Sequence, residues 1–268
     1  MLKNIINYMK AIHYSIDDVI GVFEELTKKQ PISIFDLPFF AYFQHLHNKH
    51  GLVVSCYCFF RNECFSLANC TRYYKTEFEE NSSWLRFGFH GYTGSEDYNE
   101  QSLDESARQY RDVILNLREI VGEKCLDTFP RLHAFKASSD FLKYLESNDV
   151  LSLNGLLAAD DDRNSYSLSA LENEKLKCRQ LFLKGDLALL RTTQRFDSLM
   201  LSKQMKLFAY SGGQIEFFTH EFLLFNQKNL KNKVKSIIIK LLIKATCKYY
   251  KKKGYIFSFP MDYINQLN

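Results

Sequence analysis

The amino-acid sequence predicts an α/β protein whose parallel strands close into a (β/α) barrel. Apolar, strand-like segments alternate with segments of helical periodicity along the 268 residues. This order builds parallel sheets through right-handed crossovers. Several strand segments are almost continuously apolar, as expected for strands buried on both faces. About seven such segments in a chain of this length favour a barrel over the alternative, an open doubly wound sheet.

Each predicted strand is a short apolar run between polar turn residues. These runs cover residues 11–16, 52–60, 85–89, a short segment that ends near Leu132, 150–157, 187–191 and 214–219. None of them is followed by a G-x-G-x-x-G or Walker sequence. That absence argues against a nucleotide-binding protein.

Helical periodicity fills the intervals between the strands. The expected helices cover residues 38–50, 71–81, 102–121, 138–147 and 226–250. Asp36 is the expected cap of the first helix and Gly51 its stop. Ser102 and Glu105 form a capping-box pattern at the start of the longest helix, which Gly122 ends.

Composition places residues 1–268 in a single soluble domain, with a basic C-terminal helix and tail over residues 226–268. A net charge of +4 is too small to indicate nucleic-acid binding. The late lysine runs predict a solvated helix face, and weak binding to a membrane surface or to phosphate is the alternative. No apolar run is long enough to span a bilayer.

Cysteine usage indicates a reducing compartment. The 7 cysteines are scattered without a CxxC pair. Cys56 and Cys58 lie on one face of a predicted strand, where they are poorly placed to bridge each other. The N-terminus lacks the apolar core and cleavage site of a signal peptide. Together these features predict reduced thiols and a cytoplasmic protein.

The adjacent carboxylates Asp17 and Asp18 are the first candidates for a functional site. They follow the apolar segment 11–16, and a helix-like segment comes next. Two neighbouring carboxylates repel each other, and a cation or a shared proton would relieve that cost. Parallel α/β proteins place their chemistry at this end of their strands. The alternative is a solvated pair that favours a helix N-terminus.

Later strand ends carry further polar groups. His90 ends the third predicted strand, Arg131 and His133 end the short segment near Leu132, and His220 follows the last strand. Arg131 and His133 point the same way if their segment is extended. A run of three aspartates, 160–162, is more often a solvated loop or a helix start than a site. Carboxylates and imidazoles at the ends of separate strands have the layout of a barrel active site.

Metal-assisted hydrolysis is the chemistry that fits this set of side chains. One carboxylate and two imidazoles can hold a divalent cation and leave positions open for water and substrate. A second carboxylate can take a proton from the water, and a further imidazole can protonate the leaving group. Asp17, Asp18, His90, His133 and His220 supply these groups.

The order of these motifs resembles the NodB-like polysaccharide deacetylases, whose fold is a distorted (β/α) barrel. The likeness runs from about Tyr14 to Phe222 and lies in short motifs. Segment 14–18 looks like the first motif of that family, which implies Asp17 as catalytic base and Asp18 as metal ligand. Segment 87–90 is similar to the start of the second motif, which implies His90 as a metal ligand.

The remaining motifs imply further roles. Arg131 lies in the place of the third motif and is implied to orient the base. Asp161 lies in the region of the fourth motif and, with Tyr92, is the expected substrate contact. Segment 217–220 looks like the last motif, which implies His220 as the catalytic acid.

Two departures from the family pattern concern the metal. The family carries a second histidine four residues after the first, and here that position is Gly94. The third motif also lacks its prolines. His133 or Asp97 could replace the missing ligand, and His133 is predicted because it sits at a strand end and supplies an imidazole.

The resemblance implies a cytoplasmic, bacterial, deacetylase-like hydrolase that uses a divalent metal, zinc by preference. The expected substrate is an N-acyl amino sugar or a polysaccharide precursor. The alternative is a non-catalytic carbohydrate-binding relative that lost full metal binding with the histidine at position 94. A third possibility is an interaction protein that uses the basic tail to bind an acidic partner.

Overall fold

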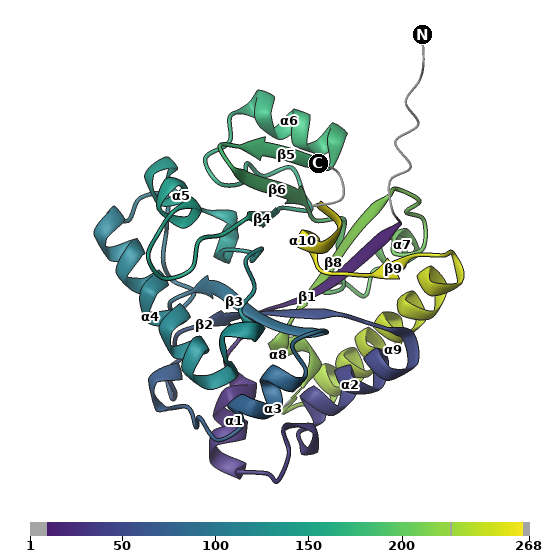
Figure 1. The fold of residues 1–268 in the computed structure, drawn as a ribbon. Coiled ribbons are helices and arrows are strands. Elements are labelled where there is room, and N and C mark those ends of the chain that lie inside the picture. The colour runs from purple at the N-terminus through teal and green to yellow at the C-terminus, as the bar shows by residue number, and fades with distance from the viewer. Residues whose placement is uncertain (1–9, 226, 265–268) are drawn as a thin grey trace.

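A parallel sheet forms the centre of the computed structural model, which describes residues 10–225 and 227–264 (Figure 1). Its strand order is β3-β2-β1-β8-β7, with β9 paired to the start of β1. These strands cover Ala11–Val19 (β1), Val54–Phe59 (β2), Leu85–Gly91 (β3), Gln194–Arg195 (β7), Gln214–His220 (β8) and Ile256–Phe257 (β9). All pairs in this sheet are parallel, as the apolar runs predict.

A second sheet continues the curve of the first. It has the order β4-β6-β5, with strands Gly155–Ala158 (β4), Leu181–Lys184 (β5) and Leu187–Arg191 (β6). β4 and β6 are parallel, whereas β5 and β6 form an antiparallel hairpin. Only Gly185 and Asp186 separate the hairpin strands, and Gly185 has φ 64°, the left-handed conformation that such short turns need.

Two stretches of chain join the sheets into a distorted barrel. On one side, Asp127 donates from its backbone N to Phe87 O on β3 (2.8 Å), and Leu157 on β4 donates to Pro130 O (2.9 Å). On the other, β6 runs on into β7, where Thr193 donates to Glu216 O on β8 (2.8 Å). The predicted strand near Leu132 is therefore an extended linking segment with a single bridge to β3. The predicted barrel is confirmed.

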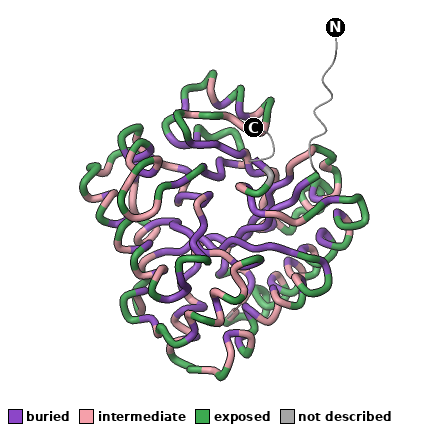
Figure 2. Tube along the Cα trace, in the orientation of Figure 1, coloured by how far each residue is buried: buried purple, intermediate pink, exposed green. Residues whose placement is uncertain are grey.

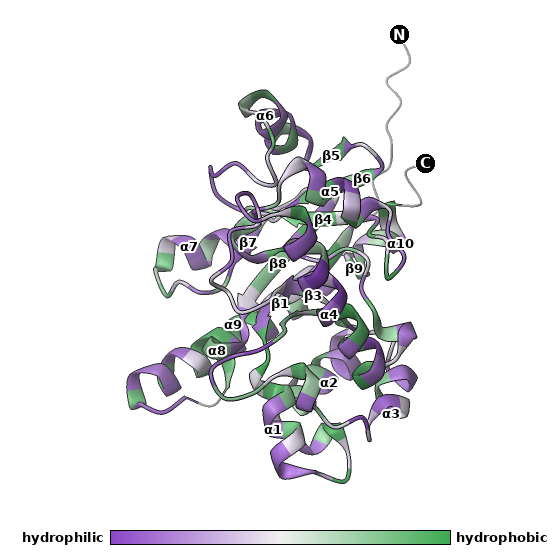
Figure 3. Cartoon of the chain, turned by 90° about the vertical axis from the view of Figure 1, so that its left-hand side faces the viewer, coloured by the Kyte–Doolittle hydropathy of each residue, from purple (hydrophilic) through white to green (hydrophobic). Residues whose placement is uncertain are grey.

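Helices cover the outside of this ring, and Figure 2 shows the buried residues gathered along its strands. The longer helices are Gly21–Lys29 (α1), Pro38–His50 (α2), Leu103–Val121 (α4), Ser139–Glu146 (α5), Ala170–Arg179 (α6) and Leu230–Lys252 (α9). The shorter ones are Lys75–Glu80 (α3), Leu201–Lys206 (α7), Glu221–Leu224 (α8) and Pro260–Ile264 (α10). Outer helices such as α4 carry both hydrophilic and hydrophobic residues, as amphipathic helices do (Figure 3).

Helix ends follow the expected signals with two adjustments. Ser102 caps α4 by accepting from the backbone N of Glu105, and Gly51 ends α2 with φ 78°. Asp36 does not cap α2; it completes a capping box with Ser33 around the short 3₁₀ turn Ile34–Asp36. The predicted start of the last helix, at Asn226, lies outside the described residues, and within them α9 begins at Leu230.

Glu221 ties the end of the barrel to its beginning. Its carboxylate accepts from the backbone N of Ile20 (2.9 Å), Gly21 (2.8 Å) and Val22 (2.5 Å) at the start of α1. These donors are otherwise left free at a helix N-terminus, where negative charge is favoured. Burial, with the charge of Asp18, raises the pKa of Glu221 to about 7 despite these three bonds. This contact joins the start of α8 to the start of α1, directly beyond the paired strands β8 and β1.

Two further features concern membrane-spanning helices and the state of the cysteines. No helix among residues 10–225 and 227–264 is long and apolar enough to cross a membrane. All 7 cysteines are free, in agreement with the absence of a disulfide framework.

Candidate active site

The two carboxylates at the end of β1 point to different partners. Asp17 keeps the strand register opposite His220 of β8. Asp18 adopts φ 60°, a left-handed conformation that aspartate tolerates better than most residues, and the pairing with β2 shifts there. This turn separates the carboxylates, so that Asp17 meets Arg131 and Asp18 meets His90.

Arg131 holds Asp17 from the linking segment between β3 and β4. Its Nη1 donates to Asp17 Oδ1 (2.8 Å) and Ser15 Oγ (2.9 Å), while Nη2 donates to Glu216 Oε1 and Thr192 Oγ1 (both 3.0 Å). The side chain is 1% exposed. Burial lowers the pKa of Arg131, but Asp17 and Glu216 outweigh it and raise the pKa above its usual value. The guanidinium therefore fixes the candidate base inside the barrel.

A buried network of polar side chains extends from Arg131 through Glu216 into the barrel. His13 Nδ1 lies 2.6 Å from Glu216 Oε2, and its Nε2 lies 2.9 Å from Ser55 Oγ, which in turn donates to Asp127. Ser15 Oγ donates to Glu216 Oε1 (2.7 Å). Beyond Arg131, none of these network residues was predicted from the sequence. The sequence does carry a signal for them, the alternation of side chains along a strand. His13 and Ser15 share one face of β1 with Asp17, and both lie in a strand that is buried almost throughout.

Asp18 and His90 form a pair suited to a metal. His90 Nε2 lies 3.1 Å from Asp18 Oδ1, and His90 Nδ1 lies 2.6 Å from the carbonyl oxygen of Arg131. A proton on Nδ1 satisfies that carbonyl and leaves Nε2 free to bind a cation when the ring is neutral. Burial raises the pKa of Asp18, but the contact and charge of His90 lower it overall, so the carboxylate stays ionised.

His133 lies beside this pair without joining it. Its ring centroid is 5.5 Å from that of His90, and its buried Nδ1 has no hydrogen-bond partner in the described part of the chain. The unpaired Nδ1 and the paired Asp18 and His90 are donors of the type that zinc takes. Residues 10–225 and 227–264 nevertheless hold no group of three His, Cys, Asp or Glu arranged around one ion. Two donors are in place, and His133 must approach them to complete the predicted triad.

Phe59 explains why position 94 does not supply the ligand. Gly94 has φ 88°, and a Cβ built there would lie 2.9 Å from the Phe59 ring. The same ring packs against His90 and His133, with centroid separations of 5.0 and 5.4 Å. Phe59 therefore occupies the space that a side chain at position 94 would need. The other predicted substitute, Asp97, pairs with Lys136 instead.

His220 is held by a residue that sequence analysis missed. Its Nδ1 lies 2.8 Å from Asp197 Oδ2, and Thr219 Oγ1 donates to Asp197 Oδ1 (3.0 Å). Asp197 belongs to the loop after β7, where no motif marks it. Burial lowers the pKa of His220, but Asp197, with Asp17 and Asp18, raises it above its usual value overall. The imidazole is therefore poised to carry a proton.

One cavity of about 170 Å³ gathers Asp17 and the three imidazoles, whereas Asp18 and Asp197 lie behind its lining. It is lined by Asp17, His90, Arg131, Leu132, His133, Ala134, Phe135, Arg163, Arg195, Phe218 and His220. Ala134 (φ 54°) and Phe135 (φ 59°) take left-handed conformations in succession, so the chain turns directly after His133, where the sequence predicted that the apolar segment meets a loop. Such strain is held in place by its surroundings and is typical of functional sites.

The two predicted substrate contacts lie outside the lining of this cavity. Tyr92 stacks on Phe60 at a centroid separation of 4.6 Å, which occupies its ring face. Asp161 pairs with Arg163 and Arg195. Asp161 therefore acts on the cavity indirectly, because it holds two arginines that do line it.

Replacing Asp197 tests the His220 pair. In Asp197→Asn we expect the pKa of His220 to fall, because the carboxylate that favours the protonated ring is gone. Stability from protonated His220 is present below its unfolded pKa and lost as pH rises through the raised folded value. Titration of the imidazole resonances by NMR measures the change. Asp161→Asn is the matched control and leaves His220 unchanged; an unaltered His220 in Asp197→Asn would contradict the pairing.

Solved structures share this architecture at low sequence identity. The Xyl-CE4 domain of a multidomain xylanase from the hindgut metagenome of Trinervitermes trinervoides aligns over 96% of this chain and 91% of its own, with a TM-score of 0.51 and 9% identity. A family 4 acetyl xylan esterase from Clostridium thermocellum, in complex with a cobalt ion, aligns over the same shares with a TM-score of 0.51 and 10% identity.

A peptidoglycan N-acetylglucosamine deacetylase, Bc1960, aligns over 93% of this chain and 86% of its own, with a TM-score of 0.50 and 11% identity. No family model and no curated protein matches the sequence. Likeness at this level of identity establishes the fold. The chain is a distorted (β/α) barrel of the kind found in family 4 carbohydrate esterases and deacetylases.

Proposed function

We propose that the chain is a metal-dependent hydrolase that removes the acyl group from an N-acyl amino sugar or a polysaccharide precursor. One observation carries the proposal: a buried carboxylate held by Arg131 and an imidazole held by Asp197 line the same cavity. Asp17 and His220 stand in register on neighbouring strands. A base and an acid at this spacing suit hydrolysis, in which one proton is taken and another is given.

Each residue has a defined task in the proposed reaction. Asp17 takes a proton from the attacking water, and Arg131 keeps its carboxylate in place. His220 gives a proton to the leaving amine nitrogen, and Asp197 favours its protonated form. Asp18 and His90 would hold the metal, with His133 as the third donor. When bound, the metal polarises the acyl carbonyl as a Lewis acid.

The substrate class is supported by the fold and by the walls of the cavity. The solved structures of this fold include an acetyl xylan esterase and a peptidoglycan N-acetylglucosamine deacetylase. Phe135 and Phe218 line the cavity, but the guanidinium groups of arginines lie over their rings, so the polar donors of the wall support the substrate class more than the ring faces do. The rim arginines Arg163 and Arg195 can donate hydrogen bonds to sugar hydroxyls.

A non-catalytic carbohydrate-binding protein is the second candidate. The observation that favours it is the two-donor arrangement, in which the Phe59 ring fills the place of a ligand at position 94. Such a protein would keep the cavity and the buried Asp17–Arg131 pair while binding no metal. The two candidates differ in one measurable property, the affinity for a divalent ion.

Metal analysis separates these candidates. We expect the purified protein, after loading with zinc and dialysis, to keep about one ion per chain, because Asp18 and His90 already lie together and His133 lies beside them. Asp18→Ala and His90→Ala should lose most of that ion, and His45→Ala on the exposed face of α2 is the matched control. Mass spectrometry of metals checks the content. Protein that takes up no zinc but binds N-acetylglucosamine oligomers in calorimetry would support the second candidate.

A further inference from the structure

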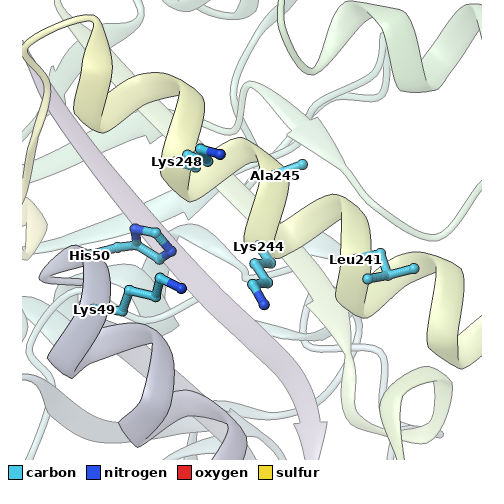
Figure 4. Close-up of a pocket in the computed structure, with 6 residues that line it drawn as sticks. All are labelled: Lys49, His50, Leu241, Lys244, Ala245 and Lys248. Atoms are coloured by element: carbon cyan, nitrogen blue, oxygen red, sulfur yellow. The ribbon is translucent and has the colours of Figure 1, made fainter.

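A groove outside the barrel runs between the end of α2 and the middle of α9. Its volume is about 460 Å³, and it is lined by Lys49, His50, Leu241, Lys244, Ala245 and Lys248. Figure 4 shows Lys49 and His50 of α2 on one side and Lys244 of α9 opposite them. Because α2 ends at His50 and β2 begins at Val54, the groove lies toward the N-terminal end of β2. Asp17 and the catalytic cavity lie at the other end of the strands.

The groove is positively charged and has no carboxylate in its lining. Neither α2 nor α9 contains an aspartate or glutamate, and residues 222–261 hold 10 lysines and no acidic residue. Among the described residues, no ion pair involves Lys49, Lys244 or Lys248, although many other lysines of this chain pair with carboxylates. Uncompensated like charges that converge on one concave surface attract an anion.

His50 provides an independent sign of a missing partner. The residue is only 8% exposed, and its buried Nε2 has no hydrogen-bond partner in the part of the chain that the structure describes. A buried polar atom without a partner is costly, so an atom of this kind in the lining of a groove points to a bound group. Burial and the ammonium groups of Lys251, Lys49 and Lys244 lower the pKa of His50, and an anion would reverse those charge effects.

The walls of the groove are held in place before any ligand arrives. Tyr42 on α2 donates from its hydroxyl to Lys240 O on α9 (2.7 Å). Lys251 Nζ donates to Lys49 O (3.2 Å), which ties the end of α2 to the last turn of α9. These contacts keep the cationic side chains close despite their repulsion, which is the preorganisation that anion binding benefits from.

We propose that this groove is a binding site for a phosphate group, carried either by a soluble phosphate ester or by a lipid headgroup. A phosphate offers several strong acceptor oxygens and about two negative charges. Those oxygens match three ammonium groups and one imidazole, and lysine binds phosphate as a compact point charge. Leu241 and Ala245 form the apolar part of the lining and can contact the group that carries the phosphate.

Calorimetric titration of the full chain with inorganic phosphate and with tripolyphosphate, at constant ionic strength, tests the site. We expect about one binding event per chain, with affinity weakened at least about tenfold in Lys244→Gln/Lys248→Gln, the loss that follows from one charge-assisted contact. The matched control is Lys231→Gln/Lys233→Gln, which removes the same charge from exposed positions of the same helix. His50→Gln should also weaken binding, and circular dichroism checks that each variant is folded.

Absence of binding by the unaltered protein, or equal weakening in the two double variants, would overturn the proposal. Sedimentation with phosphatidylserine/phosphatidylcholine vesicles identifies the source of the phosphate. Retention that is lost in Lys244→Gln/Lys248→Gln and kept in the control assigns a lipid headgroup. Binding of soluble phosphate without specific vesicle retention assigns a soluble ester. Deacetylation should continue in Lys244→Gln/Lys248→Gln, so a failure of the catalytic proposal and a failure of this one are distinguishable.

Discussion

Asp17→Asn is expected to lower the turnover number for acetate release from an N-acetylglucosamine oligomer by about 10²–10⁴-fold, the contribution of a positioned general base. The amide keeps the size of the side chain but cannot accept the proton of the attacking water. Metal content should stay unchanged, because Asp18 and His90 lie on the other side of the turn at the end of β1. Acetate assays and metal analysis on the same sample measure both quantities.

The control for this substitution is Asp140→Asn, which also removes one carboxylate but lies exposed on α5, outside the cavity lining. It should keep turnover within a few-fold of the unaltered protein. Turnover that is equal in Asp17→Asn and in the unaltered protein would remove Asp17 from the reaction. Loss of metal together with activity in Asp17→Asn would assign Asp17 to metal binding instead.

Arg131→Met is expected to lower the free energy of unfolding by about 3–5 kcal/mol, the usual cost of leaving a buried charge without its partner. The guanidinium neutralises Asp17 and Glu216 at once, and all three side chains are almost completely buried. Methionine fills much of the same volume but leaves both carboxylates uncompensated. Urea denaturation followed by circular dichroism measures the loss.

Arg163→Met is the matched control, because its ion pair with Asp161 is exposed and such pairs contribute about 0–1 kcal/mol. Adding Glu216→Gln to Arg131→Met should recover part of the lost stability, since it removes one of the two stranded charges. A loss below about 1 kcal/mol in Arg131→Met would contradict the stabilising role of the buried ion pairs of Arg131.

Much of the barrel could be predicted because its signals are local. The apolar runs of β1, β2, β3, β6 and β8 are buried on both faces, and the run at each position matches its strand to within a few residues. Ser102 and Gly51 act at the helix ends where capping chemistry places them. Asp17, His90, Arg131 and His220 could be proposed to meet because parallel strands end at one edge.

What escaped prediction depends partly on contacts between distant residues and partly on local turns. Asp197 lies in a loop, and only the tertiary fold brings it to His220. The β5–β6 hairpin was missed although its Gly-Asp turn is a known hairpin signal. The chain near Leu132 lacks strand pairing on most of its length because Ala134 and Phe135 turn away. The third donor could not be placed because it depends on how Phe59 packs.

The central position of β1 affects how the chain folds during its synthesis on the ribosome. This first strand pairs with β2 on one edge and with β8 on the other, so its polar residue His13 meets Glu216 across 203 positions of sequence. At about 5–20 residues per second, translation leaves that edge and its polar side chains unsatisfied for roughly 10–40 s. Such non-local pairing slows folding and exposes a strand edge meanwhile. We therefore expect this edge of β1 to stay unpaired until residues 214–220 have emerged.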